Sequence, residues 1–169
     1  YWEGLRLREN ANIGTFSRDI IMPMFAYGIT DKINLLAGVP YISTDATGGQ
    51  LVGAKGLQDL GIAVKAELFN RQVGPGKVSF LTTAGFAFPV SNYLSDYMPF
   101  SIGLKTREVT LRGILQYRFD NGIYARGAFA HLWRGQSKIE RDYYYNNGSY
   151  YSEWMDVPNA LNYHGAVGA

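Results

Sequence analysis

The chain has 169 residues, enough for one domain with a sizeable core, and its 16 basic and 14 acidic residues leave a net charge of +2. This near balance argues against a nucleic-acid-binding protein, which would carry a clustered basic face. Because cysteine is absent, a disulfide scaffold and thiolate metal sites are excluded. The 20 glycines and 13 tyrosines are typical of the strands, girdles and turns of β-barrels.

Apolar stretches are short throughout the chain. No window approaches the roughly 18 consecutive apolar residues of a membrane-spanning helix. If the protein crosses a membrane, we expect a closed sheet, because only helices and closed barrels satisfy every backbone group in lipid. The sequence starts at Tyr1 rather than Met, and it stops at Ala169 within a new stretch of alternating apolar and polar residues. We therefore expect either processed ends or a longer polypeptide.

Alternation of apolar and polar residues with a period of two predicts about eight β-strands. Pro23 interrupts the second of them, and in the seventh His131 falls on the side of Phe129 and Trp133. The predicted strands, in chain order, are 1–9, 13–27, 32–42, 57–69, 77–88, 108–119, 123–134 and 161–169.

The regular central strands have one apolar side and one side with charges. In 57–69 the apolar side runs from Leu60 to Leu68, and the opposite side holds Asp59, Lys65 and Glu67. Segments of about 10 residues with this pattern are the signature of transmembrane barrel strands, whereas strands of soluble proteins usually run about 5 to 6 residues.

Short and long connections alternate along the chain. The short ones, with Gly, Asn and Asp turn chemistry, are 27–31, 71–76 and 120–122; the long ones are 43–56, 89–107 and 135–159. This alternation predicts an all-β fold, an antiparallel up-and-down transmembrane β-barrel with tight periplasmic turns and long outer loops. We expect one barrel domain over 1–169, with about eight strands in this sequence.

The third long connection, 135–159, is rich in tyrosine. Three tyrosines precede Asn146-Asn147-Gly148 and two follow it, which predicts a hairpin about an Asn-Gly turn. We expect this hairpin to protrude above the bilayer, as a lid or as a docking surface for a protein partner.

Three short motifs resemble a known family. Residues 27–35 read YGITDKINL, Pro40-Tyr41 follows the next strand, and Gly56 opens a Gly-x-x-Asp motif that ends at Asp59. Over roughly 20–120 the chain resembles the outer-membrane "transporter" or phenol meta-pathway degradation family of predicted barrels. The resemblance implies a barrel of about twelve strands in the cell outer membrane of a Gram-negative bacterium. It also implies passage of small organic molecules, apolar ones included.

Charged residues on the polar sides of the strands are the candidate solute-contacting residues. Lys or Arg facing lipid at the bilayer midplane would cost about 2 to 4 kcal/mol, so we expect these side chains to face the lumen. Two interpretations stay open: a salt-bridged network that plugs the barrel, and a conducting path. The candidates are Asp59, Lys65, Glu67, Lys77, Glu108, Arg112, Arg118 and Arg126.

Aromatic residues near strand ends predict interfacial girdles in contact with outer-membrane lipid, although packing in a soluble barrel would also bury them. The girdle candidates are Trp2, Tyr27, Tyr41, Trp133 and Trp154. No cofactor or metal motif is recognised. The two histidines, His131 and His164, lie on separate strands without a nucleophile motif, so we expect no enzymatic activity.

The sequence therefore predicts a passive channel or binding protein for small molecules. The alternatives are a structural barrel subunit with a plugged lumen and a rim-active lipid hydrolase or acyltransferase. A soluble ligand-binding barrel of the lipocalin type is a further alternative, and it would need an apolar interior.

Overall fold

The computed structural model describes residues 2–5, 16–47, 53–95, 100–139, 144–146 and 150–169. Within these ranges every regular element is a β-strand, and every pair of neighbouring strands is antiparallel. A helix long and apolar enough to cross a membrane is not found in the described part of the chain. The predicted all-β, antiparallel class is confirmed.

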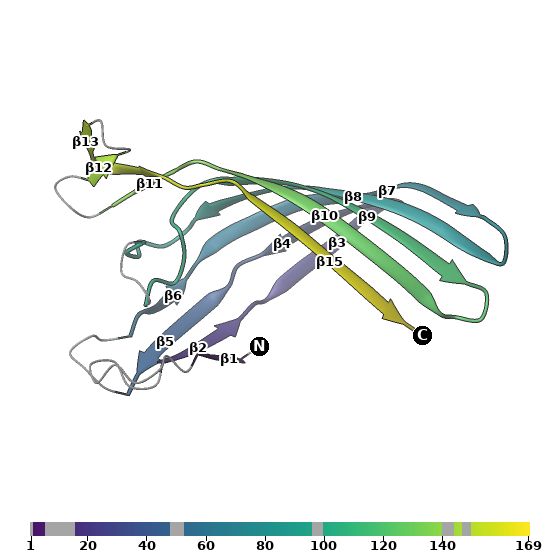
Figure 1. Cartoon of the computed structure of the whole chain (residues 1–169), viewed down its shortest axis with the longest axis horizontal. Helices are drawn as coiled ribbons and strands as arrows, with labels where there is room; N and C mark the ends of the chain where they lie inside the picture. Colours follow the sequence, from purple (N-terminus) through teal and green to yellow (C-terminus); the bar gives the residue numbers. More distant parts are fainter. Residues whose placement is uncertain (1, 6–15, 48–52, 96–99, 140–143, 147–149) are drawn as a thin grey trace.

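Seven strands form the main sheet, which runs lengthwise through the molecule (Figure 1). The longest members have 11 to 14 residues, as the extended alternation predicted. In spatial order the strands are β15 (Ala160–Gly168), β10 (Tyr124–Arg134), β9 (Glu108–Phe119), β8 (Gly76–Pro89), β7 (Asp59–Gln72), β4 (Ile33–Gly38) and β3 (Met24–Thr30).

A second sheet continues three of these strands beyond short interruptions. Its strands, in order, are β1 (Trp2–Leu5), β2 (Phe16–Ile21), β5 (Tyr41–Ala46) and β6 (Lys55–Leu57). The break between β2 and β3 falls at Pro23, as predicted, because proline lacks the backbone N–H that a central ladder needs. The prediction of one strand over 32–42 is wrong at Val39 and Pro40, because β4 ends at Gly38 and β5 begins at Tyr41.

The part of the sequence between β10 and β15 forms two short strand pairs. β11 (Gln136–Lys138) pairs with β14 (Trp154–Asp156), and β12 (Tyr144–Asn146) pairs with β13 (Tyr150–Ser152). Figure 1 shows both pairs beyond one end of the main sheet.

Short turns and long connections lie at opposite ends of the main sheet (Figure 1). The β7–β8 and β9–β10 turns contain Gly74 and Gly122, whose φ angles of 59° and 95° favour glycine. The opposite end carries the connection between β8 and β9 and the segment that includes β11 to β14.

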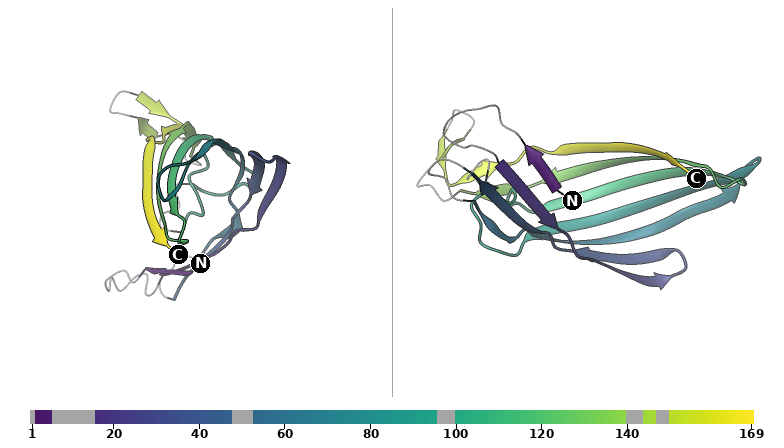
Figure 2. Two further views of the ribbon diagram at one scale, coloured as in Figure 1. Left: turned by 90° about the vertical axis from the view of Figure 1, so that its right-hand side faces the viewer. Right: turned by 90° about the horizontal axis from the view of Figure 1, so that it is seen from below.

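The main sheet is strongly curved but open. Viewed end-on in Figure 2 (left), the strands form an arc with part of the β8–β9 connection inside it. The predicted closed barrel is not found in the described residues, because β15 and β3 are outer strands and each pairs on one side only.

A bulge in β7 shifts the predicted alternation. The register moves between Glu67 and Phe69, so Phe69 lies opposite Phe80, and their rings stack 5.7 Å apart. Leu68 was expected to continue the apolar side of this strand, but it is the extra residue of the bulge. The polar side resumes after the bulge at Asn70.

A small apolar core lies where the second sheet meets the β8–β9 connection. Ile42 of β5 packs with Tyr93 and Ile102 of the connection, and Ile20 and Ala54 border them. The ring of Phe100 contacts Phe16 edge-on at 5.4 Å. This buried cluster of described residues therefore sits under one end of the sheet, between the second sheet and a connection.

Candidate functional site

The two faces of the main sheet have inverted exposure. On β9 the apolar side chains of Val109, Leu111 and Leu115 are 48%, 49% and 54% exposed. The charged residues next to them on the other face, Glu108 and Arg112, are only partly exposed. A soluble protein covers its apolar face and exposes its charges, so this sheet has the reverse of the usual arrangement.

The register carries the same apolar face across neighbouring strands. One row joins Val64, Ala84, Leu111, His131 and Leu161 from β7 to β15. At the edge of this face, Tyr163 and Val167 are 81% and 80% exposed. The apolar side is therefore a continuous surface rather than a set of isolated residues.

The eight charged candidates lie on the opposite, polar face. Four belong to β7 and β8, and four belong to β9 and β10. The β8–β9 connection packs against this same face, since it contacts Asp59, and Figure 2 shows that connection inside the arc. The polar face is therefore concave and the apolar face convex.

Five of the eight candidates surround one cavity of about 340 Å³ near the short-turn end. We call it the cationic pocket: Lys65, Glu67, Lys77, Arg118 and Arg126 supply its charges. Asn70, Ser79 and Gln116 add neutral hydrogen-bonding groups, and Leu81 and Ile114 complete the wall. The pocket has four cations and one carboxylate.

Asp59 and Glu108 lie at the other end of the polar face, in a cavity of about 210 Å³. Glu108 Oε2 accepts a hydrogen bond from Arg134 Nε at 2.8 Å, and both side chains are about one-fifth exposed. Leu104 and Thr106 of the β8–β9 connection close this loop-end cavity. In this cavity, in contrast to the cationic pocket, the charge of Arg134 is neutralised by Glu108.

Arg112 lies opposite Thr83 of β8 and Ala130 of β10, at a position along the strands between the two cavities. It contributes to a third, mostly apolar hollow with Met22, Met24 and Phe86. The structure thus brings five candidates together, places two in a separate cavity and leaves Arg112 apart.

Residues 90–107, the infolded segment, are attached to the polar face by side-chain hydrogen bonds in their described parts. The Tyr93 hydroxyl donates to Asp59 Oδ1 at 2.5 Å and accepts from the Lys105 N–H at 2.8 Å. Thr44 Oγ1 donates to the Phe100 carbonyl at 3.1 Å. At Gly103, a Cβ would lie 2.6 Å from the Tyr93 hydroxyl and 2.8 Å from Gln58 Cγ, so a larger residue would displace one of these side chains.

A second buried attachment joins the infolded segment to β11. Ser137 Oγ donates to Ser95 Oγ at 2.9 Å, and Ser137 is fully buried. The predicted outer loop 89–107 therefore lies within the curve of the sheet at one end instead of standing free. Burial, followed by the hydrogen bond to Asp59, raises the pKa of the Tyr93 hydroxyl above its ordinary value.

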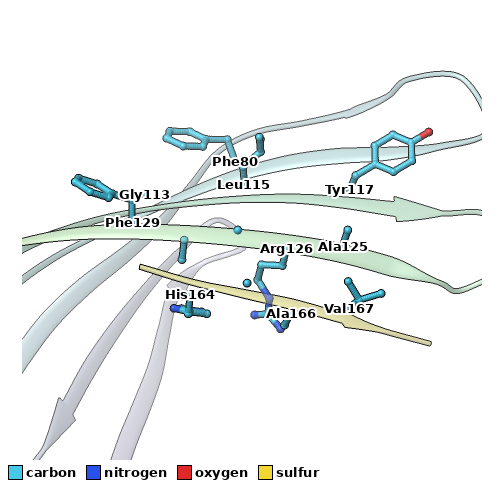
Figure 3. Close-up of a pocket in the computed structure, with 13 residues that line it drawn as sticks. Phe80, Gly113, Leu115, Tyr117, Ala125, Arg126, Phe129, His164, Ala166 and Val167 are labelled. Atoms are coloured by element: carbon cyan, nitrogen blue, oxygen red, sulfur yellow. The ribbon is translucent and has the colours of Figure 1, made fainter. Parts of the chain in front are cut away.

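The convex face has an open apolar groove of about 800 Å³ over β9, β10 and β15 (Figure 3). Gly113, Gly127 and Gly165 form its floor, and Phe80 and Phe129 stand at its sides. In Figure 3 Arg126 and His164 point to the side away from these aromatic rings. The groove belongs to the apolar surface, and the charged side chains of the same strands face the concavity.

The five girdle candidates do not share one level. Tyr27 and Trp133 lie on the apolar face, 60% and 44% exposed, in neighbouring rows of the register. Tyr41 is in the second sheet, and Trp154 is on β14 beyond the main sheet. The side chain of Trp2 lies outside the described residues.

The histidines do not form a site together. His131 lies opposite Leu111 on the apolar face, with its ring 4.3 Å from that of Trp133, while His164 lies opposite Ala128 on the polar face. Glu140, which the sequence places near His131, lies outside the described residues. In the part of the chain that is described, no three His, Asp or Glu residues converge on a common point as metal ligands would.

Three important residues were not among the sequence candidates. Arg134 was detectable, because its even spacing from Arg126 places both on the polar side of β10. Gln116 was likewise on the predicted polar side of its strand. Tyr93 had no such signal, since its role depends on a contact with Asp59, 34 residues away.

No protein-family profile, curated protein or solved structure matches this chain. The resemblance at residues 27–35, 40–41 and 56–59 stays a prediction.

Proposed function

We propose that this protein is an outer-membrane β-barrel channel for small organic molecules, with its convex face against lipid and its concave face toward water. The inverted exposure of the two faces carries the proposal. The sheet exposes Leu111 and Leu115 on one face and partly covers Arg112 on the other. Such a sheet is stable when lipid contacts its convex face and water contacts its concave face.

Strand length supports the same function. A transmembrane β-strand needs about 9–11 tilted residues, and β7, β8, β9 and β10 have 14, 14, 12 and 11. Unpaired edges are not tolerated in lipid, so the proposal requires that β15 and β3 be paired in the membrane. Either further strands of the polypeptide or strands of a second copy satisfy this requirement.

The concave face supplies a path with two regions of different charge. Solutes meet the cationic pocket at one end and the loop-end cavity, with the Glu108–Arg134 pair, at the other. The infolded segment narrows the second region and controls access to it. This function needs no catalytic group and no cofactor.

The infolded segment also favours a second candidate, a scaffold with a plugged lumen. Phe100, Ile102 and Tyr93 are buried in its packing against the sheet, as expected for a permanent filling. In this case the strands β12 and β13 beyond the sheet would dock a protein partner.

Ion conductance of the full-length protein in a planar bilayer tests the proposal. We expect steady single-channel steps, and we expect Arg112→Glu to change their size because Arg112 lies on the concave face between the two cavities. Arg71→Glu is the matched control, since Arg71 lies opposite Val78 on the convex side. A protein that folds and inserts without carrying current would contradict the channel and favour the scaffold.

A further inference from the structure

The cationic pocket contains charges that the described residues do not balance. Lys77 and Arg118 are direct cross-strand partners on β8 and β9. Like charges opposite each other destabilise a sheet, typically by a few tenths of a kcal/mol to about 1 kcal/mol. The pair therefore concentrates positive charge at this part of the polar face.

The remaining charges increase the imbalance. Lys65 and Arg126 line the same cavity, and the one carboxylate, on Glu67, accepts a hydrogen bond from Asn70 at 3.1 Å. The pocket lining carries a net charge of +3, from four cations and one carboxylate. The ion pairs formed between described residues, Arg134–Glu108 and Lys138–Glu153, both lie outside this pocket.

Arg126 has a buried donor atom in the same region. Its Nε atom has no hydrogen-bond acceptor among the described residues, and a buried donor without an acceptor costs about 1–3 kcal/mol, and more for a charged group. The guanidinium lies near the Tyr124 ring, with its carbon 5.7 Å from the ring centre, which restricts its orientation. An acceptor in the pocket would satisfy this donor.

We propose that the cationic pocket binds the oxyanion group of a small soluble molecule, a carboxylate or a phosphate. Guanidinium groups suit such oxygens because they donate two parallel hydrogen bonds, and Lys65 and Lys77 add point charges. Ser79 and Gln116 provide neutral donors beside the same cavity. Its volume of about 340 Å³ accommodates a small organic anion.

This inference rests on the proposed function, because it names the solute class of the channel. It predicts that the pore prefers anions. Under a KCl gradient we expect a reversal potential that shows chloride passing more readily than potassium, and we expect the double variant Lys77→Glu/Arg118→Glu to invert this preference. Arg71→Glu is the control, because this residue is at the same end of the sheet but on the convex face.

Binding is measured separately by titration calorimetry of the detergent-solubilised protein with succinate, with inorganic phosphate and with choline. We expect succinate or phosphate to bind and choline not to bind. Arg126→Gln should weaken anion binding roughly tenfold, the effect of losing one charge-assisted hydrogen bond. Arg71→Glu should leave the affinity unchanged, and heat-modifiable migration on a gel verifies that each variant is folded.

The two measurements separate the inference from the channel proposal. Current without anion preference, together with no binding of succinate or phosphate, would overturn the anion site while leaving the channel intact. Binding that depends on Arg126 in a protein without current would support the site and contradict the channel. Binding only to vesicles with anionic lipid headgroups would overturn the proposal of a soluble ligand.

Discussion

Tyr93 connects the infolded segment to the concave face through one hydroxyl group. This hydroxyl donates to the Asp59 carboxylate and accepts from the Lys105 N–H, and Tyr93 is 8% exposed. Because Ile102 and Ile42 pack beside it, the hydrogen bonds and the small apolar core hold the segment at the same place. Removing the hydroxyl should therefore loosen the segment without disturbing the long strands.

We expect Tyr93→Phe to lower the free energy of unfolding by about 1–3 kcal/mol, the usual effect of leaving a buried acceptor unsatisfied. Urea unfolding in detergent micelles measures this change, and proteolysis within 90–107 should become faster. Tyr117→Phe is the control, because the Tyr117 hydroxyl donates to the Val73 carbonyl at an exposed position. Equal destabilisation by the two variants would contradict the role of Tyr93.

The attachment through Tyr93 should also depend on pH. Its pKa is raised in the folded protein, first by burial and then by the hydrogen bond to Asp59. The contribution to stability is therefore complete below the ordinary phenol pKa of about 10 and is lost as the pH rises through the higher folded-state value. We expect proteolysis of 90–107 to accelerate only above pH 10 in the wild type. A Tyr93→Phe protein with the same alkaline acceleration would contradict this assignment.

The sequence predicted on which face of the sheet a residue lies, but not which residues meet in one cavity. Alternation placed Lys65, Lys77 and Arg118 on polar sides, and the structure has them on one face. It did not indicate that they meet in one cavity while Asp59 lies in another, because this depends on the register between strands. Periodicity within a strand contains no information about its partner's offset.

The β9 strand shows the difference between the two faces of the sheet most clearly. Thr110 and Leu111 are adjacent in sequence but lie on opposite faces, and Leu111 is 49% exposed on the convex side. With the convex face in lipid, as proposed, a charge added there would enter lipid, whereas a charge added on the concave face would remain in water.

We expect Leu111→Lys to destabilise the protein by about 2–4 kcal/mol in lipid vesicles. Thr110→Lys should change stability much less, since it places the same group beside Glu108 on the polar face. Equilibrium folding into vesicles, followed by tryptophan fluorescence, measures both. Equal effects, or a greater effect of Thr110→Lys, would contradict the face assignment.

The sequence predicted where the regular strands begin and end, but it did not predict the bulge and the break within strands. The regular alternation predicted β8, β9 and β10 to within about two residues at each end. The bulge at Leu68 and the break at Pro40 were missed, because both belong to strands whose composition still alternates. A bulge adds one residue to one strand, and its position is fixed by pairing rather than by local preference.

At the scale of the whole molecule, the sheet is an open arc whose concave side is partly filled. The infolded segment was predicted as part of an outer loop, since it belongs to a long polar connection that alternates with short turns. Its burial results from contacts with Thr44, Asp59 and Ser137, which lie far away in the sequence. The proposed channel depends on which solvent each face of the arc meets.

Cysteine scanning of β9 in lipid vesicles tests that claim most directly, because the chain has no cysteine of its own. Single cysteines at Val109, Leu111 and Leu115 should be shielded from an aqueous maleimide, and a fluorophore attached there should be quenched by spin-labelled lipid. Cysteines at Thr110, Arg112 and Gln116 should react with the maleimide and escape lipid quenching. Uniform aqueous reactivity without lipid quenching, or the reverse alternation, would contradict a sheet that lies with its convex face in the membrane.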